Sequence, residues 1–141
     1  MSPRFDFICI FARDLRRSFR FYHDLIGLRG TIQGDYVEFD HEGIRFGLYD
    51  RTAFARLMGL DEDITIGFPT LNLGMALALQ VADVDAEYAR LVSLGAKGLR
   101  PPRDEPWGLR SAYISDPDGT PIELFRWLPG HGPTGAGAQT E

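Results

Sequence analysis

The chain has 141 residues, of which 44% are hydrophobic and 25% charged, values typical of one compact globular domain. Its formal net charge of -5 and its lack of a basic stripe exclude nucleic acid as an expected partner, because binding phosphates needs clustered cations. The single cysteine, Cys9, excludes an intrachain disulfide. The first residues do not read as a secretory signal, and no apolar run is long enough to cross a bilayer. We therefore expect a cytoplasmic protein without a membrane partner.

The first half of the chain predicts one amphipathic helix among several short strands. Asp14 stands where a helix cap belongs, apolar residues then recur every three to four positions, and Gly27 fits the helix end. A second, short helix is predicted over 52–58. The strands are predicted over 5–11, 28–32, 36–39 and 44–49, the last two flanking the turn-like Asp40-His41-Glu42-Gly43.

The second half predicts the same order of elements. Asp83 caps a helix that ends near Gly95. The proline-rich stretch 101–108 predicts a loop, and the Gly- and Pro-rich residues 129–141 predict a disordered tail. The strands are predicted over 73–81, 97–100, 109–115 and 120–127, the last two around Asp116-Pro117-Asp118-Gly119.

This order is an internal repeat. The segment around Asp14 matches the one around Asp83 at an offset of 83 − 14 = 69, and the turn at Asp40 matches the turn at Asp116 at an offset of 116 − 40 = 76. The sequence therefore predicts an α+β fold of two tandem βαβββ modules, one over about 4–58 and one over about 71–128, together forming a single domain over 1–128.

Two motifs carry a resemblance to a known superfamily. One is Ala12-Arg13-Asp14-Leu15 through Ser18, Phe21-Tyr22 and Leu25-Ile26-Gly27-Leu28; the other is Asp116-Pro117-Asp118-Gly119 through Ile122-Glu123-Leu124. Together they resemble the vicinal-oxygen-chelate superfamily, which includes glyoxalases, bleomycin resistance proteins and extradiol dioxygenases. The resemblance covers most of residues 5–127. It implies an eight-stranded cup with helices outside, and in metal-using members two ligands from each module.

The positions that match those ligands are Phe7 and Ala76 in the first strands and Gly47 and Glu123 in the last. Only Glu123 offers a donor atom, and one carboxylate does not hold a catalytic divalent ion. None of His23, His41 and His131 falls on a predicted strand position facing the cup. The sequence therefore predicts no metal and no cofactor.

Without a metal, the predicted cup is a pocket for a small molecule. Strand alternation and hairpin pairing predict which residues line this pocket. The hairpins are expected to place Glu38 across from Arg45, and Ala112 across from Glu123 with Arg110 two residues along. The candidate ligand-binding residues are Phe7, Cys9, Phe11, Tyr36, Glu38, Arg45, Gly47, Tyr49, Ala76, Trp107, Arg110, Phe125 and Trp127. Glu123 is a structural partner of Arg110 in one interpretation, and a general base or ligand anchor in another. Cys9 is more consistent with a buried filler than with a nucleophile.

Three functions remain open on the sequence. The first is a metal-free binding protein of the glyoxalase/bleomycin-resistance type that holds an aromatic or hydrophobic ligand, as relatives that sequester an antibiotic between two subunits do; a homodimer is then expected. The alternative is a lyase, isomerase or dioxygenase of the same superfamily that uses Glu123 as a base or has divergent metal ligands. The third is a partner-binding module whose cup is filled by its own aromatic side chains. The sequence does not identify the ligand.

Overall fold

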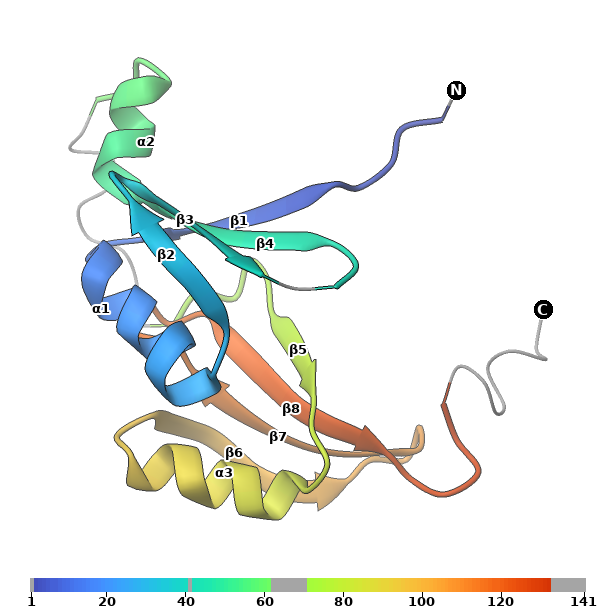
Figure 1. Ribbon diagram of the computed structural model, residues 1–141. Helices are drawn as coiled ribbons and strands as arrows, with labels where there is room; N and C mark the ends of the chain where they lie inside the picture. Colours follow the sequence, from blue (N-terminus) through green and yellow to red (C-terminus); the bar gives the residue numbers. More distant parts are fainter. Residues whose placement is uncertain (1, 41, 62–70, 133–141) are drawn as a thin grey trace. The chain divides into compact units, whose positions relative to one another are not determined.

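The computed structural model describes residues 2–40, 42–61 and 71–132 as two compact units, Met1–Thr70 and Leu71–Glu141 (Figure 1). The first unit contains strands β1, β2, β3 and β4 and helical segments α1, η1 and α2. Their bounds are β1 Phe7–Ala12, α1 Leu15–Arg20, η1 Phe21–Ile26, β2 Arg29–Gln33, β3 Tyr36–Asp40, β4 Arg45–Asp50 and α2 Arg51–Leu57. The second unit contains β5 Leu77–Gln80, α3 Val84–Ser93, β6 Lys97–Asp104, β7 Leu109–Ser115 and β8 Pro121–Trp127.

The two sheets share one topology, which confirms the predicted α+β pair of modules. Their strand orders are β1-β4-β3-β2 and β5-β8-β7-β6. In each sheet the first strand pairs in parallel with the fourth, and the remaining pairs are antiparallel. The helix and the two antiparallel strands that follow it make the long connection that the parallel pair requires.

The first helix begins and ends as the sequence predicts. The Asp14 carboxylate accepts a hydrogen bond from the Arg17 backbone N–H at 3.2 Å, and Gly27 ends the helix in the left-handed conformation with φ 95°. From Phe21 onward the segment is a π-helix, which the apolar spacing does not reveal. Its buried Tyr22 packs edge-on against Phe46, with ring centroids 5.5 Å apart.

The helix of the second unit packs on the β6, β7 and β8 strands (Figure 1). Asp83 caps it, accepting from the Ala86 backbone N–H at 3.0 Å. Its Val84 and Leu91 are fully buried, as are Ile122 and Leu124 on β8. These apolar side chains therefore form the core of the second unit.

Three segments differ from the prediction. Strand β6 continues through Pro101 and Pro102, which the sequence places in a loop. It is the edge strand of its sheet and has register shifts near Arg100. An edge strand tolerates prolines because the backbone N–H groups on its outer side have no strand to pair with. Strand β5 begins only at Leu77. Residues 129–132, placed in the tail by composition, form a turn in which the His131 N–H donates to the Leu128 carbonyl at 3.0 Å. Residues 133–141 lie outside the described part of the chain.

Among the described residues, no helix is long and apolar enough to cross a membrane.

Candidate ligand-binding site

Each sheet has one face covered by a helix and an opposite face, here called the open face. In the first unit the open face carries alternate residues of three strands, paired in register. They are Phe7, Cys9 and Phe11 on β1, Arg45, Gly47 and Tyr49 on β4, and Tyr36 and Glu38 on β3. This is the set that alternation predicts, so the assignment of faces in the first module is confirmed.

Five aromatic rings form a continuous chain across this open face. The ring centroids are 6.1 Å apart for Phe7 and Tyr36, 6.0 Å for Tyr36 and Tyr49, 5.6 Å for Tyr49 and Phe54, and 4.4 Å for Phe54 and Phe11. These distances are in the range of favourable aromatic pairs. Phe11 at the end of the chain is 38% exposed. The sequence missed Phe54, because it comes from helix α2, whose orientation on the sheet no strand pattern gives.

A cluster of polar side chains lies at the Phe7 end of this row of aromatic rings. The Tyr36 hydroxyl donates to Glu38 Oε1 at 2.6 Å, and Arg45 Nη1 donates to both oxygens of Glu38 at 3.1 and 3.0 Å. Arg45 also bonds Asp6 at 2.7 Å and lies 5.1 Å over the Phe7 ring. Burial and then the bond to Glu38 raise the pKa of Tyr36 to about 12. The donors around Glu38 are therefore engaged within the protein.

The two positions in this unit that match metal ligands are occupied by an interlocked pair. A Cβ on Gly47 would collide with the Val37 carbonyl oxygen and would lie 2.9 Å from Cζ of Phe7. The space beside Gly47 is therefore occupied by the Phe7 ring, and it is not open to a ligand. Neither residue carries an atom that binds a divalent ion, so the first module does not fit the metal site of metal-using relatives.

Cys9 lies in the same face, directly across from Gly47. Its thiol contacts the Ile10 carbonyl at 3.7 Å, and burial raises its pKa to about 11. This supports the interpretation of Cys9 as a buried filler.

We therefore expect Cys9 to react with a disulfide reagent about 100-fold more slowly in the native protein than in the unfolded chain at pH 8, because only the thiolate attacks. The measurement is the rate of 5-thio-2-nitrobenzoate release with and without guanidinium chloride. Equal rates in the two states would show that the thiol is accessible and ionised in the folded protein.

In the second unit Glu123 lies half-buried on the open face. Tyr113 on β7 and Ala78 on β5 are its partners in register, and the Tyr113 hydroxyl donates a hydrogen bond to its carboxylate. Burial raises the pKa of Glu123, and the bond from Tyr113 opposes that rise. The predicted pairing of Ala112 with Glu123 is wrong by one residue.

Arg110 is not a neighbour of Glu123, contrary to the prediction. It pairs in register with Arg126 on the helix-covered face, and it bonds Asp85 at the start of α3 through two contacts of 2.7 Å and Asp104 at 3.0 Å. Arg110 therefore ties α3 to the sheet, and the proposed ion pair with Glu123 is absent.

A partly buried ion pair that the sequence did not predict lies on the same open face as Glu123. Arg100 donates to Glu105 at 2.7 Å and to the Ser111 hydroxyl at 2.8 Å, and Ser111 Oγ lies 3.2 Å from Glu105. Arg100 also lies 5.1 Å over the Tyr113 ring. The cluster depends on the register shifts of β6, for which the sequence carries no signal.

The remaining predicted residues of the second module fall in three places. Phe125 and Trp127 follow Glu123 on the open face, with ring centroids 6.0 Å apart. Ala76 is exposed and precedes β5. Trp107 is 61% exposed in the turn between β6 and β7. The structure thus groups Phe125 and Trp127 with Glu123, while Ala76 and Trp107 lie outside the strands.

The histidines contribute no site in the described residues. His23 lies in η1, where it bonds Asp24 at 2.7 Å and stacks on Phe19, and His131 lies in the turn after β8. His41 lies outside the described residues. Within the ranges 2–40, 42–61 and 71–132, no three His, Cys, Asp or Glu side chains form a group that could hold a metal ion. Glu123 therefore gains no second donor there.

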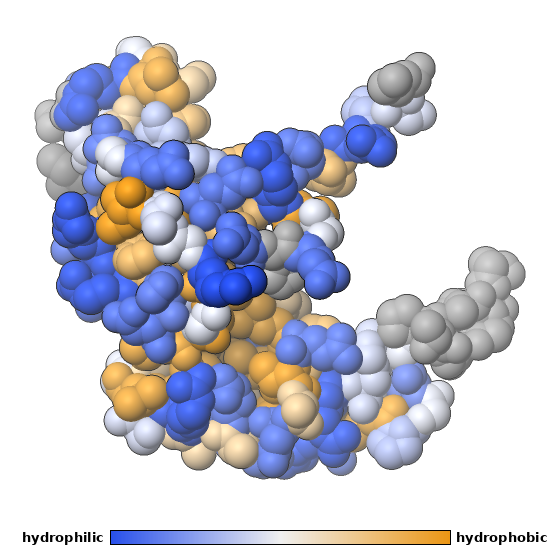
Figure 2. All heavy atoms as spheres, in the orientation of Figure 1, coloured by the Kyte–Doolittle hydropathy of each residue, from blue (hydrophilic) through white to orange (hydrophobic). Residues whose placement is uncertain are grey.

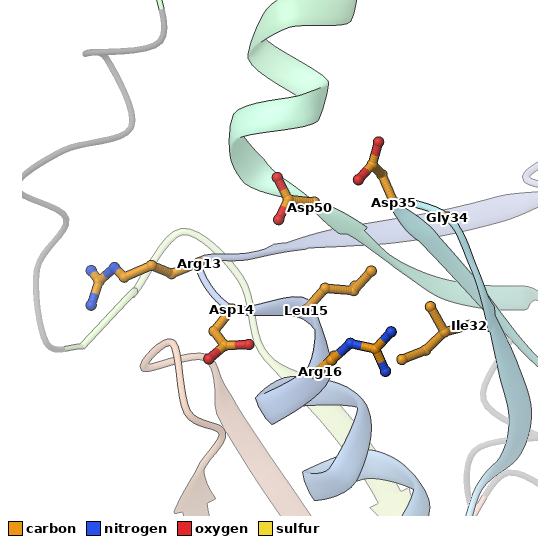
Figure 3. Close-up of a pocket in the computed structure, with 8 residues that line it drawn as sticks. All are labelled: Arg13, Asp14, Leu15, Arg16, Ile32, Gly34, Asp35 and Asp50. Atoms are coloured by element: carbon orange, nitrogen blue, oxygen red, sulfur yellow. The ribbon is translucent and has the colours of Figure 1, made fainter.

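The first unit also has a surface recess of about 410 Å³, on the helix-covered side of the sheet (Figure 3). It is lined by Arg13, Asp14, Leu15, Arg16, Ile32, Gly34, Asp35 and Asp50. Two of its carboxylates already have structural roles, because Asp14 caps α1 and Asp50 caps α2 through the Ala53 N–H at 2.8 Å. None of the predicted site residues lines it, so we do not place the ligand there.

Helix α2 presents further apolar side chains beside the aromatic chain. Figure 2 shows hydrophobic residues gathered on this helix, and Leu57, Met58 and Leu60 at its end are exposed. Exposed apolar groups of this kind often mark a binding surface.

Comparison with known proteins identifies relatives over most of the chain. The family model described as Glyoxalase/Bleomycin resistance protein/Dioxygenase superfamily matches residues 4–124. The chain is 29% identical over 125 residues to the Bacillus subtilis (strain 168) protein named Uncharacterized protein YraH, covering 86% of this chain and 96% of that protein. A crystal structure of a glyoxalase/bleomycin resistance protein/dioxygenase from Nocardioides is similar at a TM-score of 0.77 and 26% identity, covering 94% of this chain and 89% of that one. A protein of unknown function from Agrobacterium tumefaciens is similar at a TM-score of 0.73 and 27% identity, covering 91% and 97%.

Proposed function

The chain belongs to the glyoxalase/bleomycin resistance protein/dioxygenase superfamily, and from that premise we propose that it is a metal-free protein that binds an aromatic small molecule on its open faces. The observation that carries the proposal is the chain of five aromatic rings in the first unit, which ends at the partly exposed Phe11. Flat rings of this kind bind planar ligands by stacking and by burial of apolar surface.

The absence of donors at three matched positions supports binding without a metal. Phe7 and Gly47 interlock, Ala76 has no donor, and Glu123 is bonded by Tyr113. We assign no particular drug as the ligand, and we expect the protein to be a homodimer, as the resemblance implies. Native mass spectrometry of the purified protein counts subunits and retained small molecules in the same spectrum.

The test is equilibrium dialysis against a panel of planar aromatic compounds that includes aromatic antibiotics, followed by titration of the tightest binder into variants. We expect Phe11→Ala and Phe54→Ala to weaken binding about 10-fold each, since each removes one stacking ring. Leu94→Ala, which removes an exposed apolar side chain just after the end of α3, is the matched control and should leave the affinity unchanged. A panel without a single binder, or a binder whose affinity ignores both phenylalanines, would refute the proposal.

A further inference from the structure

The hydrogen bonds around Glu123 define what kind of polar group the second module can hold. The Tyr113 hydroxyl donates its one proton to the Glu123 carboxylate. Its oxygen therefore offers only lone pairs to a third group. The carboxylate itself, when ionised, only accepts. The two side chains together present acceptors to anything that contacts them.

The nearby cation Arg100 does not supply a hydrogen-bond donor to Glu123, because its own donors are engaged elsewhere. The charged groups that act on Glu123 are Arg100 and Glu105. These two form an ion pair of 2.7 Å, in which Arg100 also donates to Ser111 at 2.8 Å and to the Pro101 carbonyl at 3.0 Å. Arg100 is thereby held against the Tyr113 ring, and its direct ion pair is with Glu105.

The third partner in register adds no donor. Ala78 lies across from Glu123 on β5 and carries only a methyl group. Phe125 and Trp127, the next residues of β8 on the same face, add apolar walls. The surroundings of Glu123 therefore combine aromatic surface with hydrogen-bond acceptors.

We propose that the second module selects aromatic ligands that present a hydrogen-bond donor, a phenolic O–H or an alkylammonium N–H, to Glu123 and Tyr113, and rejects aromatic carboxylates. This inference rests on the proposed function, because it names the polar end of a ligand that the open faces bind. An anionic ligand would leave two carboxylates facing each other without a donor between them, which costs desolvation on both sides.

The experiment compares four probes with one ring system, titrated by calorimetry at pH 8 into the full chain. The probes are 1-naphthol, 1-naphthylmethylammonium, 1-methoxynaphthalene and 1-naphthoate. We expect the first two to bind about 10-fold or more tighter than the last two, as a hydrogen bond to a charged group implies. The pair of naphthol and its methyl ether tests the donor, because in the ether a methyl group replaces only the hydroxyl proton.

Substitutions at Glu123 and Tyr113 test whether these two residues cause the preference for ligands with a hydrogen-bond donor. In Glu123→Leu all four probes should bind alike. In Glu123→Gln the ammonium should lose its advantage while naphthol keeps part of it, since the amide oxygen still accepts. Tyr113→Phe, which keeps the ring under Arg100, should reduce the naphthol preference about 3-fold. Glu87→Gln removes a partly exposed carboxylate that pairs with Arg90 on α3, and it is the control that should leave the preference unchanged.

The outcomes separate this inference from the proposed function. Equal binding of all four probes by the wild-type chain, or tightest binding of naphthoate, overturns the donor preference and leaves aromatic binding intact. Failure of all four probes and of the wider aromatic panel to bind overturns both. Should Glu123→Leu melt at a much lower temperature than the wild type, Glu123→Gln and Tyr113→Phe carry the test, and an unchanged preference in both overturns the inference.

Discussion

Replacing Glu105 with alanine is expected to destabilise the protein by about 3 kcal/mol, because it leaves a partly buried cation without its carboxylate. The Glu105 side chain is 5% exposed and that of Arg100 is 22% exposed. Glu105 accepts from Arg100 at 2.7 Å and from Arg103 at 3.3 Å. Unfolding by guanidinium chloride, monitored by circular dichroism, measures the change in the free energy of unfolding.

Arg103→Ala provides the matched control in the same cluster. Its side chain is 62% exposed and its contact to Glu105 is the longer one, so the expected loss is about 0.5 kcal/mol or less. Equal losses for Glu105→Ala and Arg103→Ala would mean that the buried Arg100 pair contributes nothing beyond a surface ion pair.

Gly47→Ala is expected to destabilise the first unit by about 2–3 kcal/mol through overpacking. The added Cβ meets the Val37 carbonyl oxygen and the Phe7 ring. The double substitution Phe7→Ala/Gly47→Ala should not restore stability, because the contact with the Val37 backbone remains. Chemical unfolding of the single and double variants measures both effects.

Gly74→Ala is the control for this prediction. A Cβ there meets only the end of the Asn72 side chain, at 3.1 Å, so we expect a change of about 0.5 kcal/mol or less. A double variant that is more stable than Gly47→Ala alone would show that the Phe7 ring, and not the sheet backbone, limits the space at position 47.

The two hairpin predictions show which errors of register matter. The structure pairs Glu38 with Gly47, two residues from the predicted partner Arg45, because a longer turn separates β3 from β4. A shift of two keeps every side chain on its face, and Arg45 still reaches Glu38. The assignment of the open face in the first module therefore survived the error.

In the second hairpin the error is one residue, and a shift of one exchanges the faces. The Asp116 carboxylate accepts from the Asp118 and Thr120 backbone N–H groups at 2.8 and 2.9 Å, so Thr120 belongs to the turn and the last pair is Ser115 with Pro121. This exchange moved Arg110 to the helix-covered face and brought Tyr113 beside Glu123. The turn chemistry of Asp116 was visible in the sequence, but not the number of residues it holds.

Other parts of the site depend on contacts between segments that no local pattern specifies. Helix caps and strand alternation act within a few residues, and both were predicted at Asp14 and Asp83 and along β1. The ring contact of Phe54 with Phe11 and the burial of Glu105 under Arg100 arise from tertiary packing.

The interlock of Phe7 and Gly47 also bears on how this chain can change over evolutionary time. A donor side chain introduced at position 47 collides with the Val37 carbonyl whatever residue occupies position 7, and a donor at position 7 alone has no partner across the sheet. A single substitution that adds a metal-binding side chain at position 47 is therefore expected to lose stability before it contributes to a metal site. This cost is a barrier to acquiring an ion in the first module, and descendants of this chain are expected to vary the aromatic surface instead.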